Sequence, residues 1–255
     1  MSKDLFYLVN GRIITPYRMI SNSGLLIEGN KIKNLFPMDS CHPYNGAKIL
    51  DVNGAFIAPG FIDMHLHGGG GADVMDGTPE AFATIAEIHA KGGATSIVPS
   101  TITSSIQDLK RAIVAFDEAG KMKISGSGLL GLHLEGPYFA PSQKGAQDIR
   151  FIKDPVREEY LRILDSSSSI IRVSAAPELP GGLELGRELR RRGILASIGH
   201  TDASYDEVLL AIEAGYTHVT HLYSGMSGVH RVRAYRIAGV IESGLLLDDL
   251  TVEII

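Results

Sequence analysis

The pattern of hydrophobic and polar positions changes near residue 55. Before it, short apolar runs are separated by turn residues such as Gly11, Gly29 and Asn30. Short runs bounded by Gly and Asn predict β-strands joined by turns. The runs cover residues 5–10, 12–14, 24–28, 31–36 and 48–52. We therefore expect residues 1–54 to form a small β domain.

From residue 55 onward, near-continuous apolar runs alternate with stretches that have helical periodicity. The apolar runs predict strands over residues 56–67, 95–101, 128–135, 170–176, 194–199, 218–222 and 251–255. The intervening stretches predict helices near residues 80–91, 106–119, 155–164, 183–192, 205–214 and 237–243. Apolar strands that are each followed by a helix are typical of a parallel sheet covered by helices. Strict alternation favours a closed barrel, which needs eight strands. The sequence therefore predicts an α/β fold over residues 55–255, a TIM-like (β/α) barrel in which the eighth strand is missing.

Composition narrows the class of protein. The chain has 255 residues, 44% of them hydrophobic and 21% charged, with a net charge of −5 and no basic block. These values favour an ordinary globular protein and argue against binding to nucleic acid or to an anionic membrane. Cys41 is the only cysteine, which excludes an internal disulfide framework. The first residues lack the anatomy of a signal peptide, and no apolar stretch approaches the ~20 residues of a membrane helix. We expect a cytoplasmic enzyme.

Two histidines end the first predicted barrel strand. His65 and His67 are two positions apart, so both side chains leave the same face of the strand. Four glycines follow at residues 68–71, which allow the backbone to approach a ligand closely. A single histidine is more often structural than a ligand, but this pair at a strand end favours a metal site.

Glu135 ends the third predicted strand. Burying a carboxylate at the end of an apolar strand is costly unless it meets a cation, although an exposed loop glutamate is the alternative. His133 shares the face of Glu135, and either metal ligation or support of a ligand fits it equally well.

Further histidines lie elsewhere along the chain. His200 follows the fifth predicted strand and His221 ends the sixth. His218 has the opposite parity to His221, so we expect His221 to be the ligand and His218 to be structural. His89 on a helix and His42 in a loop are expected to be solvent-exposed bystanders.

The candidate ligands all lie at the carboxyl ends of predicted strands, the face on which barrel active sites are built. Nitrogen and carboxylate ligands without thiolates suit zinc or another divalent first-row ion. Five candidate ligands are enough for one ion or for two ions about 3.5–4 Å apart, and a bound water could then attack an amide carbonyl.

Several separated motifs resemble the N-acetylglucosamine-6-phosphate deacetylases, a family of the amidohydrolase superfamily. The motifs are Pro-Gly-Phe-Ile-Asp at 59–63, His-Gly at 67–68, His-Leu-Glu-Gly-Pro at 133–137, Gly-His-Thr-Asp-Ala at 199–203 and Thr-His-Leu-Tyr at 220–223. They occur in the family's order over nearly the whole chain. The resemblance implies a metal-dependent hydrolase barrel with Glu135, His200 and His221 on the main ion. Some members hold a second ion through the histidine pair, which here is His65 and His67.

The resemblance also implies a phosphorylated amino-sugar substrate. The family removes acetate from N-acetylglucosamine 6-phosphate, and its members are commonly homodimers. Its sugar-binding Asn-Ala-Met segment reads Ser224, Gly225 and Met226 here. Its phosphate-binding arginine corresponds to Arg231 or Arg233, because a guanidinium fork suits a phosphate; exposed surface charge is the alternative for both.

The family's acid–base aspartate corresponds to a position beyond Ile255. Asp202 lies in a Thr-Asp-Ala string like the one around that aspartate, but its place after the fifth strand predicts a helix cap. The sequence therefore offers no catalytic aspartate, and we expect this chain alone to hydrolyse its substrate poorly. The alternatives are another amidohydrolase, in which a carboxylated lysine commonly replaces the glutamate, and a non-catalytic metal-binding remnant.

Overall fold

The computed structural model describes residues 5–29, 31–43 and 46–255. Within them the chain divides into two compact units, Met1–Gly60 and Phe61–Ile255. The larger unit contains all of the candidate ligands.

The first unit is a five-stranded sheet. Its strands are β1 (Leu5–Ile14), β2 (Met19–Glu28), β3 (Lys31–Pro37), β4 (Lys48–Asp51) and β5 (Phe56–Ile57). The order is β3-β2-β1-β4, and β5 also pairs with β1. The turn predicted at Gly11 is wrong: Gly11 lies within β1 at an irregularity of its register, and Ile57 occupies the space that a side chain would need. Gly29 does end β2 with a positive φ, while Asn30 lies outside the described residues.

The second unit is built on parallel strands that pair in chain order. They are β6 (Phe61–Leu66), β9 (Ala94–Pro99), β10 (Gly128–Leu129), β11 (Leu132–Glu135), β12 (Ile170–Ala175), β13 (Leu195–Ile198), β14 (Tyr216–Val219) and β17 (Thr251–Val252). They form the sheets β10-β9-β6 and β11-β12-β13-β14-β17, and a parallel bridge from Ser100 to His133 connects the two. No pairing joins β6 to β17 among the residues described, so the array is open there.

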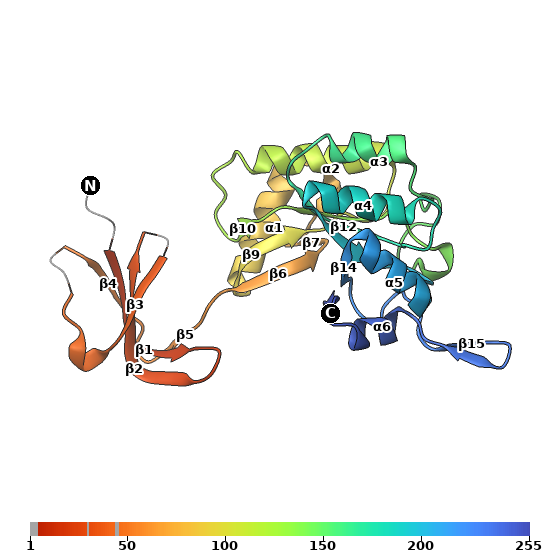
Figure 1. The fold of residues 1–255 in the computed structure, drawn as a ribbon. Coiled ribbons are helices and arrows are strands. Elements are labelled where there is room, and N and C mark those ends of the chain that lie inside the picture. Colours follow the sequence, from red (N-terminus) through yellow and green to blue (C-terminus); the bar gives the residue numbers. More distant parts are fainter. Residues whose placement is uncertain (1–4, 30, 44–45) are drawn as a thin grey trace. The chain divides into compact units, whose positions relative to one another are not determined.

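Helices separate these strands and cover the sheet (Figure 1). They are α1 (Pro79–Lys91), α2 (Ile106–Ala119), α3 (Arg157–Leu164), α4 (Gly182–Arg192), α5 (Tyr205–Ala214) and α6 (Val240–Leu246). Neighbours along the chain pack together, α1 with α2, α4 with α5 and α5 with α6. In the described part of the chain, no helix combines the length and apolarity that a bilayer crossing requires.

Local sequence explains where the helices begin. Thr78, Ser105 and Ser204 each accept a hydrogen bond from the backbone of the first helical turn, which satisfies an otherwise unpaired N–H group. Between helices and sheet lies one apolar core that includes Phe82, Ile97 and other residues with little or no exposed surface. This packing fixes the strands whose carboxyl ends carry the candidate ligands.

Several predicted elements differ from those observed; the strand predicted over residues 128–135, for example, is divided into β10 and β11. The strand predicted over residues 56–67 is two strands, because β5 pairs with β1 in the first unit while β6 starts the parallel array. The helix predicted near residues 237–243 begins later, at Val240, since residues before it form a hairpin of β15 (His230–Val232) and β16 (Tyr235–Ile237). A second small hairpin, β7 (Gly68–Gly69) with β8 (Ala72–Asp73), follows β6. Short 3-10 helices are η1 (Met38–Ser40), η2 (Val74–Asp76) and η3 (Pro141–Gln143).

Candidate metal centre

Glu135 stands at the centre of the candidate site. It is the last residue of β11, is only 1% exposed, and carries its carboxylate where the parallel strands end. Nε2 of Gln147 donates to Oε2 of Glu135 over 3.0 Å, and Nε2 atoms of four histidines surround the two carboxylate oxygens. Burial would raise the pKa of Glu135, but the contacts with these imidazoles outweigh it and hold the pKa well below its usual range. The carboxylate is therefore charged, which suits a cation site.

His200 and His221 form one side of the site. Nε2 of His200 lies 3.2 Å from Oε1 of Glu135, and Nε2 of His221 lies 3.1 Å from the same oxygen. The two Nε2 atoms are themselves 3.2 Å apart. Ligand atoms about 2.0–2.1 Å from a tetrahedral zinc ion are roughly 3.3 Å from one another. The three atoms thus have the spacing of one face of a zinc tetrahedron.

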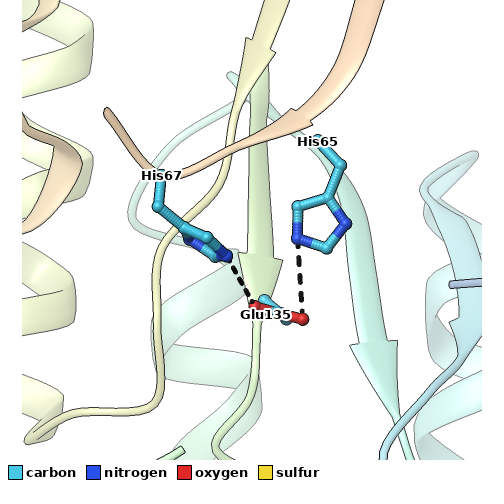
Figure 2. A group of neighbouring side chains, drawn as sticks. All are labelled: His65, His67 and Glu135. Carbon is cyan, nitrogen blue, oxygen red and sulfur yellow. Dashed lines mark ion pairs between the residues drawn. The ribbon is translucent and has the colours of Figure 1, made fainter. Parts of the chain in front are cut away.

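His65 and His67 form the other side. Figure 2 shows both rings directed at Glu135 from the end of β6, with Nε2 of His65 3.5 Å from Oε1 and Nε2 of His67 3.2 Å from Oε2. Burial opposes a charge on His65, yet hydrogen bonds with Glu135 and Glu253 raise the pKa of His65 to about 9. The side chain of His67 is 40% exposed, so this side of the site is more open to solvent than the other.

The ring nitrogens that face away from Glu135 are mostly engaged. Nδ1 of His200 lies 2.8 Å from the carbonyl oxygen of Gln143, and Nδ1 of His67 lies 3.0 Å from that of Ser100. A carbonyl oxygen can only accept, so the proton of each neutral ring sits on Nδ1 and the lone pair of Nε2 points at Glu135. Lone pairs and a carboxylate repel one another unless a cation lies between them, and the donor set therefore fits a divalent metal ion.

Two groups of three potential ligands share Glu135. The first is Glu135 with His200 and His221, and the second is Glu135 with His65 and His67. In each group the ligand atoms lie within 4.8 Å of one another. Oε1 of Glu135 faces one histidine of the second group and both of the first, and Oε2 faces His67, so the carboxylate can serve either one ion or two.

The remaining predicted histidines lie outside both groups. The ring of His133 is fully buried between the hydroxyl groups of Ser100 and Ser174, and burial keeps its pKa well below the ordinary value. Nδ1 of His218 lies 2.7 Å from the hydroxyl of Thr251. His42 is exposed, as predicted.

The prediction for His89 as an exposed bystander is wrong. Its side chain is only 23% exposed, and Nε2 lies 3.1 Å from the carbonyl oxygen of Gly68. Helix α1 packs beside the β7–β8 hairpin, so this face of the helix is covered. His89 therefore contacts the glycine segment that follows the ligand pair.

The predicted cap at Asp202 is also wrong, because Ser204 caps α5. The carboxylate of Asp202 instead accepts hydrogen bonds from Ser142 and, over 2.5 Å, from Nε2 of Gln143. Since the carbonyl of Gln143 contacts His200, Asp202 supports the segment that orients that ring. Asp202 is exposed, and its carboxylate contacts η3. It is connected to Glu135 only indirectly, through Gln143 and His200.

The residues proposed for substrate lie in two places. Ser224 and Gly225 follow His221, and a methyl group on Gly225 would come within 2.9 Å of Nδ1 of His200. A cavity of about 440 Å³ beside them is lined by residues that include Gln143 and Met226. Arg231 on β15 and Arg233 in the adjoining turn are exposed.

Sequence reasoning missed Glu253, Arg172 and Gln147. Glu253 directly follows β17 and lies 2.7 Å from Nδ1 of His65, so the signal that identified Glu135, a carboxylate ending an apolar strand, applied to it as well. Arg172 is a charge within the apolar strand β12, which indicates a buried partner. Gln147 lies in a loop and carries no comparable signal.

Comparisons with known proteins agree on the kind of protein. The sequence profile of the amidohydrolase family matches residues 56–255. The chain is 35% identical over 249 residues to N-acetylglucosamine-6-phosphate deacetylase from Bacillus subtilis, covering 95% of this chain and 61% of the relative. It is 33% identical over 190 residues to N-acetylgalactosamine-6-phosphate deacetylase from Escherichia coli O157:H7, covering 74% of this chain and 49% of the relative.

A solved structure has the same fold. It is a mutant of N-acetyl-D-glucosamine-6-phosphate deacetylase from Mycobacterium smegmatis in complex with N-acetyl-D-glucosamine 6-phosphate. The match has a TM-score of 0.84 at 29% identity and covers 100% of this chain and 63% of that one. The chain thus spans about half to two thirds of the length of these proteins.

Proposed function

The chain belongs to the amidohydrolase family, and from this premise we propose that it acts in the metal-dependent hydrolysis of the acetamide of N-acetylglucosamine 6-phosphate. The products are glucosamine 6-phosphate and acetate. Support comes from the relatives that carry this name and from the ligand groups gathered around Glu135. The ligand groups carry the proposal, since a charged carboxylate facing four imidazoles is arranged for a cation.

We propose that Glu135, His200 and His221 hold the main ion and that His65 and His67 hold a second ion with Glu135. Zinc is the ion that the donor set favours, because the ligands are nitrogen and oxygen atoms at tetrahedral spacing. When bound, the metal would polarise the acetamide carbonyl and acidify a water molecule. The chain's own contribution is orientation: backbone carbonyl groups fix the rings of His67 and His200, and burial keeps competing water from Glu135.

Substrate recognition is proposed for the segment after His221. Gly225 adjoins His200, and Met226, the residue after it, lines the cavity near Gln143, so Ser224 and Gly225 are suited to contact the sugar. Arg231 and Arg233, on the exposed hairpin, are the candidates for the 6-phosphate. The resemblance to the deacetylases also supports a cytoplasmic location and a homodimer. Size-exclusion chromatography tests the dimer.

Acetate release tests the proposal. Zinc-loaded protein is incubated with N-acetylglucosamine 6-phosphate, and the same assay is run on Glu135→Gln and on chelator-treated protein. We expect the loaded protein to bind the sugar phosphate and to release acetate slowly, as the sequence predicts for this chain alone, and both controls to release none. Absence of both binding and release with the loaded protein would contradict the proposal.

N-acetylgalactosamine 6-phosphate is a second candidate substrate. The similarity to the Escherichia coli O157:H7 enzyme of that name favours it. The two sugars differ only in the configuration of one hydroxyl group, so the same assay on both, compared by kcat/KM, decides between them.

A further inference from the structure

We propose that Glu253 is a positioning residue that orients His65 for cation binding, and that Arg172 holds Glu253 in place. The inference rests on the proposed function, since it concerns a ligand of the second ion. None of the motifs that suggested the metal centre includes Glu253 or Arg172.

Arg172 is the buried anchor of this arrangement. It lies on β12, is 1% exposed, and its Nη1 donates to Oε2 of Glu253 over 2.6 Å. Its Nη2 donates over 3.0 Å to the hydroxyl of Thr220. Burying a guanidinium without a partner is costly, so Arg172 pairs with Glu253 and fixes the position of its carboxylate.

Glu253 divides its two oxygens between different tasks. Oε2 accepts from Arg172, while Oε1 lies 2.7 Å from Nδ1 of His65 and accepts from the backbone N–H of His221 over 2.9 Å. The carboxylate thereby contacts one residue from each ligand group. Its backbone is also held, because the N–H of Glu253 donates to Val219 and its carbonyl accepts from Leu222. The side chain is thus presented from a fixed position.

The consequence for His65 is a defined ring orientation. An ionised carboxylate can only accept, so it places the proton of the neutral ring on Nδ1 and turns the lone pair of Nε2 towards Glu135. Backbone carbonyl groups do the same for His67 and His200. His65 differs because a side chain, that of Glu253, orients its ring. This side chain can be replaced without changing the main chain.

The substitution Glu253→Gln separates orientation from packing. It preserves size and one oxygen acceptor, but that oxygen cannot serve both Arg172 and His65, and the amide nitrogen cannot accept from either. A second variant, Arg172→Met with Glu253→Gln, removes both charges and frees the amide oxygen for His65. Glu188→Gln is the matched control, because Glu188 is also buried and ion-paired, on α4 with Arg191.

The test is a zinc titration of each protein against a chromophoric chelator, with metal content measured by elemental analysis and thermal unfolding recorded in parallel. We expect two ions on the unaltered protein. Glu253→Gln should weaken the second ion by about 10–100-fold, the usual effect of losing a partner of a metal-ligating histidine, and leave the main ion within about threefold. The double variant should recover part of the loss, and Glu188→Gln should alter only the thermal midpoint.

Two results would overturn the inference, and they differ. Two ions with unchanged constants in Glu253→Gln, whatever its thermal midpoint, would mean that Glu253 has only a structural role, while the proposed function stands. One ion on the unaltered protein would remove the second position from the proposed function, and the inference with it.

Discussion

Nε2 of His200 lies 3.2 Å from Nε2 of His221, with Oε1 of Glu135 at a similar distance from both. The two rings meet at a large angle, 89° between planes, so the nitrogens converge on one point and do not stack. The carbonyl of Gln143 keeps the proton of neutral His200 on Nδ1, so the unprotonated Nε2 of His200 faces this point and suits a cation there. This relationship between two residues 21 positions apart is the geometric basis of the main ion position.

Replacing either residue should therefore remove the main ion. His200→Ala and His221→Ala each delete one of only three protein ligands, and we expect affinity for that ion to fall by on the order of 100-fold or more. Elemental analysis after dialysis measures the effect, with exposed His42→Ala as the control. Full metal retention in either variant would refute the assignment.

His65→Ala should have a smaller effect. It removes a ligand of the second group only, so metal content should fall from two ions to one per chain while the main ion stays. Elemental analysis of the same preparations is the measurement. If the variant lost all metal, the ligands would have to be divided between the ions in a different way.

Binding of the second ion should depend on pH. The pKa of His65 is raised from 6.5 to about 9, so its imidazolium stabilises the metal-free fold fully below pH 6.5, and this stabilisation is lost as the pH rises through 9. A metal ion needs the unprotonated Nε2 and must displace that proton. Affinity should accordingly rise by about tenfold per pH unit between pH 6.5 and 9, for one proton released.

Competitive zinc titrations at three pH values in that range provide the measurement. In parallel, the thermal midpoint of metal-free protein should fall as the pH rises, and His65→Ala should lose this dependence. An affinity for the second ion that does not change with pH would contradict the account.

Gly225→Ala should disturb the main ion without touching a ligand directly. The new methyl group would meet Nδ1 of His200 at 2.9 Å and the carbonyl of Gln143 at 3.2 Å, so the ring must move. Gly71→Ala is the matched control: its φ is also positive, at 85° against 58°, but its methyl group would meet open space. Both changes add strain of about 1–3 kcal/mol.

We expect only Gly225→Ala to weaken the main ion, by about tenfold. Zinc titration of both variants, with thermal unfolding to measure the common strain, makes the comparison. Equal zinc affinity in the two would show that the contact with His200 has no consequence.

Much of the site could be predicted because strand periodicity carries directional information. His65 and His67 share a strand face, and Glu135 ends an apolar strand, so the structure brings their side chains together as the pattern predicts. His221 faces Glu135 and His218 does not, as parity predicted, although His221 lies beyond β14 with a φ of 30°. Gln147 could not be predicted from the sequence pattern, because its position beside Glu135 depends on the path of a loop.

The fold was predictable to a similar extent and for related reasons. The helices from 106–119 and 205–214 begin and end where predicted, because Ser105 and Ser204 mark their starts and glycines follow their ends. The β15–β16 hairpin was missed because its strands are three residues long, too short for a periodic pattern. The resemblance drawn from separated motifs is confirmed by the amidohydrolase family match over residues 56–255 and by the similarity to relatives named N-acetylglucosamine-6-phosphate deacetylase.

The most direct test of the metal centre is anomalous diffraction at the zinc absorption edge from crystals grown with zinc. The account predicts a peak about 2.0–2.2 Å from a carboxylate oxygen of Glu135 and from Nε2 of His200 and of His221. A second, weaker peak should lie between Glu135 and the rings of His65 and His67. Zinc bound elsewhere, with Glu135 contacting only protein atoms, would contradict the central claim.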